Sequence, residues 1–110
     1  MHKGHRERIK NRFLNEGLDN FEDHQVLELI LFYSIPMRDT NELAHALIRQ
    51  YGSLSAVLEA EVEDLMTVPG IGKNSAILLS LIPSLSRRYF KDRWGDRPKL
   101  NSTSKAGEYL

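Results

Sequence analysis

The sequence has no cysteine. Disulfide bonds and thiolate metal sites are therefore excluded, and the absence fits a reducing cytoplasm. No apolar run approaches the roughly 18 residues that a membrane-spanning helix needs. The N-terminus, Met1-His2-Lys3-Gly4-His5, also lacks the apolar stretch of a signal peptide. We expect a cytoplasmic protein without a membrane partner, and its 110 residues suit one domain with a modest core.

Patterns typical of catalysis and metal binding are missing as well. The four histidines, His2, His5, His24 and His45, are scattered and form no H-x-H motif. His24 and Glu28 would share a helical face at i, i+4, but a zinc site needs about four converging ligands, three of them from the protein if it is catalytic. No nucleophile–base pair and no cofactor loop occurs. We therefore expect no catalytic residue, metal or cofactor within these residues.

A net charge of zero conceals a strong segregation of charge along the chain. Residues 1–12 carry five cations and one acid, residues 16–64 carry two cations and eleven acids, and residues 65–110 carry eight cations and three acids. The two basic ends could form one nucleic-acid-binding surface, with the acidic middle facing away from it. Alternatively, the charges simply solvate helix faces.

The spacing of apolar residues predicts an all-α fold, a small bundle of about five to six helices. Helices are expected over residues 4–16, 22–34, 39–51, 53–59 and 61–66, and from about residue 72 onward. The run 22–34 is apolar nearly all round, so it should be the central buried helix. Pro83 lies within the last helix and predicts a kink or a break there.

Helix ends and aromatic residues give further expectations. Gly17 and Gly52 are typical C-terminal glycines. Asp39 with Glu42 fits a capping box, and Ser53 is a cap for the helix that follows it. The aromatic residues expected in the core are Phe13, Phe32, Tyr33 and Tyr51. Tyr89 and Trp94 are the only aromatic residues near cations, although packing is the favoured role for both.

The most informative segment is Val68-Pro69-Gly70-Ile71-Gly72-Lys73-Asn74-Ser75-Ala76. Pro69 ends one apolar-periodic helix. Gly70 and Gly72 permit positive φ and let another backbone approach closely. The next helix begins at about Gly72, so its first amides point outward at the positive end of the helix dipole. With the charge of Lys73 beside them, these amides predict a site for a nucleic-acid phosphate.

Two other phosphate-binding motifs do not fit this segment. A Walker loop needs serine or threonine after Gly-Lys, where Asn74 stands, and glycine where Thr67 stands. A dinucleotide fingerprint needs a preceding strand and a third glycine, where Ser75 stands. The remaining pattern resembles the helix-hairpin-helix motif of DNA repair proteins. That resemblance implies that the backbone of Gly70, Ile71, Gly72, Lys73 and Asn74 binds a DNA phosphate without reading sequence, with a monovalent cation held by hairpin carbonyls.

An earlier segment is a weak repeat of this hairpin. Residues 28–44 run from an apolar helix through Ile35-Pro36 to a helix with a small alanine, as residues 63–76 do through Val68-Pro69. The first copy has one extra residue and no glycine in its turn. The pair resembles the tandem helix-hairpin-helix domains of repair nucleases, with the second hairpin intact and the first expected to be its structural twin.

A longer set of motifs resembles the N-terminal domain of the RadC family over about residues 4–94. These motifs are Gly4-His5-Arg6-Glu7-Arg8-Ile9, Leu27-Glu28-Leu29-Ile30-Leu31-Phe32-Tyr33-Ser34-Ile35-Pro36, Asp39-Thr40-Asn41, Gly52-Ser53-Leu54, Val68-Pro69-Gly70-Ile71-Gly72 and Arg87-Arg88-Tyr89. The resemblance implies a domain over residues 1–94. It also implies that residues 95–110 form a linker and the start of an absent JAB/MPN-type zinc metallohydrolase domain, which would hold the zinc and the catalytic residues.

Two functions remain open. The first is a weak, sequence-independent DNA-binding module. Its footprint would be extended by Arg6, Arg8, Lys10, Arg12, Arg87, Arg88 and Lys91. The second is a protein-interaction or regulatory domain whose hairpin serves packing alone. The acidic middle of the chain and the missing glycines of the first hairpin favour this second reading.

Overall fold

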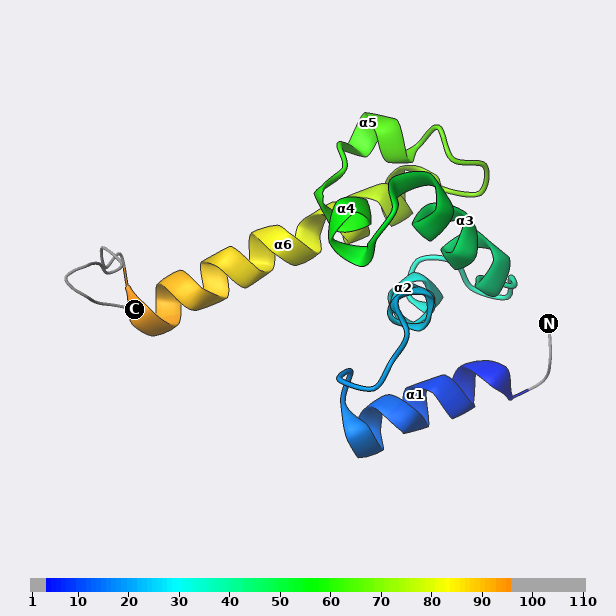
Figure 1. Ribbon diagram of the computed structural model, residues 1–110, viewed down its shortest axis with the longest axis horizontal. Helices are drawn as coiled ribbons and strands as arrows, with labels where there is room; N and C mark the ends of the chain where they lie inside the picture. The colour runs from blue at the N-terminus through cyan, green and yellow to red at the C-terminus, as the bar shows by residue number, and fades with distance from the viewer. Residues whose placement is uncertain (1–3, 96–110) are drawn as a thin grey trace.

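The computed structural model describes residues 4–95, and all regular secondary structure within that range is helical (Figure 1). Its elements are α1 (His5–Glu16), α2 (Asp23–Phe32), α3 (Asn41–Tyr51), α4 (Leu54–Glu59), α5 (Val62–Leu65) and α6 (Lys73–Trp94). The all-α prediction is confirmed. The predicted linker after residue 95 and the helix start at Lys105 lie outside the described residues.

Helix α2 lies at the centre of the bundle, as its apolar sequence predicts. It packs against α1, α3, α4 and α6, and its Leu27 and Leu31 are fully buried. Burying a leucine side chain stabilises a fold by about 1.5–3 kcal/mol. The other members of this core come from all the later helices and turns: Ile35, Ala44, Leu47, Val57, Leu65, Val68, Ile71, Ala76 and Leu79.

Helix α6 starts in this core and then projects away from the bundle (Figure 1). Its buried residues all lie in the first two turns, and Leu79 is the last of them. Of the predicted kink or break at Pro83, the break is wrong, because a single helix runs from Lys73 to Trp94, and the kink stays a prediction. Eleven residues follow Pro83, rich in good helix formers such as leucine, arginine and lysine. At the C-terminal end of α6 the amide of Gly95 donates a hydrogen bond to the carbonyl oxygen of Lys91 at 2.6 Å.

Two of the four aromatic residues expected in the core are exposed. Phe32 is buried and Tyr51 is half-buried, but Phe13 is 42% exposed and Tyr33 is 72% exposed. Helix α1 packs chiefly against α2, so the outer margins of these two helices have no further layer over them within residues 4–95. The expectation for Phe13 and Tyr33 was therefore wrong. In the same range, no helix has the length and hydropathy that a membrane span requires.

The ends of the helices follow the expected pattern with one exception. Gly17 and Gly52 end α1 and α3 with positive φ, and the Ser53 hydroxyl accepts the amide of Ala56 at 3.1 Å. These predictions are confirmed. The cap of α3 is different: the N-cap residue is Thr40 instead of Asp39. The Asp39 carboxylate accepts a hydrogen bond from the amide of Asn41 at 2.9 Å. This bond to a residue two positions later forms a local turn, which competes with regular helix capping.

The guanidinium group of Arg6 joins α1 to the turn after α2. It donates to the carbonyl oxygens of Phe32 at 3.0 Å, Ile35 at 2.6 Å and Arg38 at 2.7 Å. It also lies over the Phe32 ring, with Cζ 4.6 Å from the ring centroid. Three carbonyl groups that a helix end and a turn leave unsatisfied are thus held by one cation.

We predict that Arg6→Gln lowers the free energy of unfolding by about 2–3 kcal/mol, because hydrogen bonds from a charged donor are lost and carbonyl groups remain unpaired. Urea unfolding measures the effect. Arg8→Gln is the matched control on the exposed side of the same helix, and it should change stability by less than about 0.5 kcal/mol. Equal effects of the two substitutions would show that Arg6 does not hold the turn.

A second long-range bond ties α3 to α5. The hydroxyl of Tyr51 donates to Asp64 Oδ2 at 2.8 Å. Burial, followed by the hydrogen bond and the negative charge of Asp64, raises the pKa of Tyr51 to about 12. Because α5 has only four residues, this bond helps to hold the helix that leads into the glycine-rich turn.

The raised pKa of Tyr51 predicts a stability change at alkaline pH. The protonated hydroxyl stabilises the folded state fully below the ordinary tyrosine pKa of about 10. This contribution is then lost as pH rises from about 10 toward 12. The difference in unfolding free energy between the unmodified chain and Tyr51→Phe should be constant up to about pH 10 and decline above it. A difference that does not vary over this interval would contradict the assignment.

Candidate nucleic-acid interface

The turn between α5 and α6 is anchored by two apolar side chains. Val68 and Ile71 are buried, and the Ile71 amide donates to the Val68 carbonyl oxygen at 3.0 Å. Gly70 lies between them with φ 97°, a conformation that a residue with a Cβ adopts only at a cost. The turn therefore places its apolar side chains in the core and leaves Gly70 and Gly72 exposed.

The two glycines, both of which could have adopted positive φ, have different conformations and different roles. Gly72 has φ −95° and ψ −174°, an extended conformation that any residue can adopt. A Cβ built on Gly72 would have nothing within 4 Å, whereas one on Gly70 would stand 3.4 Å from Leu43 Cδ1. Gly70 is therefore required by the turn itself. The absence of a side chain at Gly72 instead keeps the space outside the turn open.

Helix α6 begins without a capping side chain. Its N-cap is Gly72, and no side chain bonds to its first amides. Within residues 4–95, the backbone amides of Gly72, Lys73 and Asn74 have no hydrogen-bond acceptor, and all three residues are exposed. These amides and the helix dipole together form a partial positive charge that faces solvent.

A hollow of about 390 Å³ lies beside these amides, between the two turns of the protein. The first turn contributes Pro36 and Arg38, and the second contributes Gly70, Gly72, Lys73 and Asn74. At its edge the hydroxyl oxygens of Ser34 and Ser75 are 2.8 Å apart and link the two turns. The residues that line the hollow include two cations and no acid. An anion entering it would meet two cations and the free amides at the start of α6, and no carboxylate.

Arg38 is a member of this site that sequence reasoning missed. It follows the αL residue Met37, which has φ 66°, just as Ile71 follows the αL residue Gly70. The alignment of the two repeats was the available signal, since it places Arg38 at the tip of the first turn. The first hairpin thus contributes a side chain to the hollow although it has no glycines.

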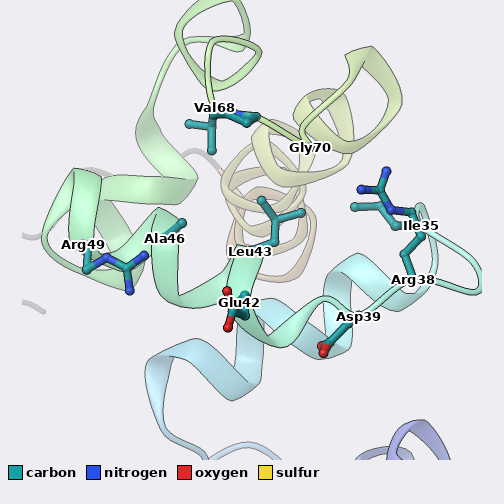
Figure 2. A pocket seen from close by; sticks show the side chains of 10 residues that line it. Ile35, Arg38, Asp39, Glu42, Leu43, Ala46, Arg49, Val68 and Gly70 are labelled. Atoms are coloured by element: carbon teal, nitrogen blue, oxygen red, sulfur yellow. The ribbon is translucent and has the colours of Figure 1, made fainter. Parts of the chain in front are cut away.

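The other side of the second turn is less suited to an anion. A hollow of about 320 Å³ there is lined by Arg38 and Arg49, but also by Asp39 and Glu42 (Figure 2). Leu43 lies beneath the turn between Val68 and Gly70 (Figure 2). The opposing charges nearly balance on this side, so the acid-free hollow is the better candidate for a phosphate.

The predicted cationic contacts on α1 are mostly engaged within the protein. Arg6 binds the three carbonyl groups described above. Arg12 donates to Gln25 Oε1 at 3.1 Å and to the Asn20 carbonyl oxygen at 2.6 Å. Lys10 pairs with Glu7 at 2.9 Å. Arg8 is exposed, and within residues 4–95 its side chain makes no hydrogen bond or ion pair, so it is the α1 cation most accessible to a ligand.

The predicted contacts on α6 are remote from the hairpin. Arg87, Arg88 and Lys91 are exposed and follow Lys73 by 14 to 18 residues. A helix rises about 1.5 Å per residue, which places them roughly 21–27 Å along the axis from the start of α6. A footprint that joins them to the hairpin must extend over that length, and their part in it stays a prediction.

His24 and Glu28, which the sequence places on one helical face, each have a different partner. Glu28 is buried and lies 3.1 Å from His5 Nε2, and it is not paired with His24. The ring of His24 instead stacks on that of His45, with centroids 4.0 Å apart. No group of three or more histidine, cysteine, aspartate or glutamate side chains that could hold a metal ion occurs in the described range. The predicted monovalent cation at the hairpin stays a prediction.

Comparison with known proteins identifies relatives. The sequence matches the family described as UPF0758 N-terminal over residues 2–77. It is 42% identical over 90 residues to a UPF0758 protein of Fusobacterium nucleatum. The matched region covers 82% of this chain and 39% of that relative, so the chain spans about two-fifths of the relative's length. No solved structure matches significantly.

The contrast between the two glycines predicts different responses to the same substitution. Gly70→Ala should lower the free energy of unfolding by about 1–2 kcal/mol, because alanine is strained at positive φ, and Leu43 adds a close contact. Gly72→Ala should change it by no more than about 0.5 kcal/mol. Chemical denaturation of both variants measures the difference. Similar losses for both would mean that Gly72 also needs a glycine-specific conformation.

Proposed function

The chain belongs to the UPF0758 family, which is the RadC-like family, and on this premise we propose that it is a sequence-independent DNA-binding module. The observation that carries the proposal is the acid-free hollow beside the uncapped start of α6. A phosphate there would supply the acceptor that the first amides lack, as anions do at other helix N-termini.

Each residue of the hollow has a defined role in this proposal. The amides of Gly72, Lys73 and Asn74 donate to the phosphate oxygens. Lys73 adds a full charge beside them, and Arg38 approaches from the first turn on the opposite side of the hollow. These groups reach the DNA backbone and not the base edges, so they position the protein without selecting a sequence. With two or three phosphate contacts, the expected Kd is about 10⁻⁴ to 10⁻⁶ M at physiological salt.

The longer relative suggests how such a weak module would be used. We infer that in the full-length cytoplasmic protein it is joined to a JAB/MPN-type metallohydrolase domain, as the RadC resemblance implies. That domain would hold zinc and carry out catalysis, and the hairpin domain would bring it to DNA. In this arrangement the 110 residues serve binding, and the reaction belongs to the part of the protein that follows them.

One observation favours the alternative of a protein-interaction or regulatory domain. An apolar hollow of about 230 Å³ lies between α1 and α2, lined by Lys10, Phe13, Leu14, Leu29 and Tyr33. Leu14 and Tyr33 are each more than 70% exposed. Exposed apolar groups gathered around a hollow are typical of a protein contact. In this alternative the glycine-rich turn serves packing alone.

The double variant Gly72→Val/Lys73→Glu tests DNA binding. The valine side chain occupies the open approach at an unstrained position, and the glutamate repels a phosphate. Affinity for a short duplex at about 50 mM salt should therefore fall tenfold or more, while the unfolding midpoint stays close to that of the unmodified chain. Fluorescence anisotropy of labelled DNA measures the affinity. Arg49→Glu is the charge-matched control on the acid-lined side of the turn, and it should have a smaller effect.

The salt dependence gives an independent check. Two or three phosphate contacts predict a slope of about −2 in a plot of log affinity against log salt concentration. The proposal fails if the unmodified chain shows no binding at about 50 mM salt. It fails equally if the double variant binds DNA as well as the unmodified chain does.

A further inference from the structure

The far end of α6 carries three aromatic side chains that are about half exposed. Tyr89 is 54% exposed, Phe90 52% and Trp94 48%. The rings contact one another: Phe90 and Trp94 stack with centroids 5.3 Å apart and planes at 24°, and Tyr89 meets Phe90 edge-on at 5.5 Å. Packing was the role expected of Tyr89 and Trp94, but each of these rings packs on Phe90 and not in the core.

No other element covers this cluster in the part of the chain that the structure describes. The buried residues of α6 end at Leu79, and the rest of the helix extends beyond the bundle (Figure 1). Three large aromatic side chains held half in water carry a substantial hydrophobic cost. Contiguous exposed apolar surface of this kind commonly marks a binding site.

The aromatic cluster is surrounded by cations. Arg87, Arg88 and Arg93 are exposed, and the Arg93 guanidinium lies over the Trp94 ring, with Cζ 5.4 Å from the centroid. Asp92 is the single acid between residues 84 and 95. Aromatic rings among guanidinium groups complement a ligand that carries flat aromatic groups along a negatively charged backbone.

We propose that the far end of α6 is a stacking platform for the unpaired bases of single-stranded nucleic acid. A base stacks on the exposed faces and edges of the Tyr89, Phe90 and Trp94 cluster, and the neighbouring arginines contact the adjoining phosphates. Such stacking is tolerant of sequence, because every base has a π face. The Arg93 guanidinium, which lies over the Trp94 ring, places a positive charge beside the cluster, where it can contact the phosphate next to a stacked base.

This platform is separate from the hairpin. Trp94 follows Lys73 by 21 residues, which is roughly 32 Å along a helix. The platform therefore does not depend on the proposed role of the turn, and the two sites can be tested apart. Self-association through the same cluster is disfavoured, because it would bring together the arginines of two copies.

The chain carries its own reporter for the test, because Trp94 is its single tryptophan. We expect an oligothymidylate of about 12 nucleotides to quench Trp94 fluorescence at about 50 mM salt, and a blunt duplex of equal length to quench it much less. Tyr89→Leu/Phe90→Leu keeps the reporter and should weaken binding of the oligonucleotide about tenfold. Leu85→Ala, an exposed apolar residue earlier on the same helix, is the matched control and should not change affinity.

Two further arms separate the alternatives. An oligouridylate of the same length distinguishes RNA from DNA as the source of the bases, and quenching by either strand supports the platform. The Gly72→Val/Lys73→Glu variant should retain the quenching, so failure of the hairpin leaves this result unaffected.

The proposal is overturned if neither strand changes Trp94 fluorescence, or if Tyr89→Leu/Phe90→Leu binds the oligonucleotide as tightly as Leu85→Ala does. It is overturned as well if the emission depends on protein concentration without nucleic acid, since the cluster would then be a contact between copies. Circular dichroism of each variant checks that the helix is intact. We expect it to be, because the substituted residues are exposed and lie outside the core.

Discussion

The first turn of α6 has amides with no acceptor because the helix begins at a residue without a side chain. Two other helices satisfy first-turn amides with side chains: Glu22 and Gln25 form a capping box at α2, and Ser53 caps α4. The N-cap residues of α1, α3 and α5 make no such bond. At Gly72 a serine or aspartate would fit the extended backbone conformation and would cap the helix better. Because Gly72 has no side chain, the first amides of α6 stay uncapped, and the candidate phosphate site depends on these free amides.

The first turn, after Pro36, has a backbone conformation similar to that of the second, but a side chain from another helix binds its carbonyl groups. Both turns have a left-handed residue directly after the proline, Met37 with φ 66° and Gly70 with φ 97°. In the first turn this conformation is held by a side chain from elsewhere, because Arg6 binds carbonyl groups on both sides of Met37. Asp39 accepts the amide of Asn41 at the start of α3. The carbonyl groups of the first turn are thereby satisfied from within, and this turn contributes the Arg38 side chain to the hollow, whereas the second turn contributes the first amides of α6.

The helices and most of their ends could be predicted from the sequence, because periodicity, glycine and serine act over a few residues. Contacts between distant segments could not. Nothing near Arg6 in the sequence indicates that its partners lie about 30 residues away, so it was interpreted as a surface cation. Phe13 and Tyr33 were assigned to the core because an apolar helix face does not reveal whether another layer covers it. Pro83 has the local signature of a helix break, but the favourable residues on both sides outweigh it. Arg38 required the spatial pairing of two turns.

A net charge of zero determines how such a protein can bind a polyanion. Glu59 ends α4, Glu61 is the N-cap of α5, and Glu63 and Asp64 lie on α5. None of these acids lines the hollow between the turns. At physiological salt a charge is screened over about 8 Å, so the cations in the hollow act locally while the whole protein exerts little long-range attraction. Affinity must then come from short-range contacts, each of them weak. Two such contacts at opposite ends of one helix reinforce each other, because the first raises the effective concentration of the second. A duplex phosphate at the start of α6 and an unpaired base at its end would together select nucleic acid that contains both, which neither contact selects alone.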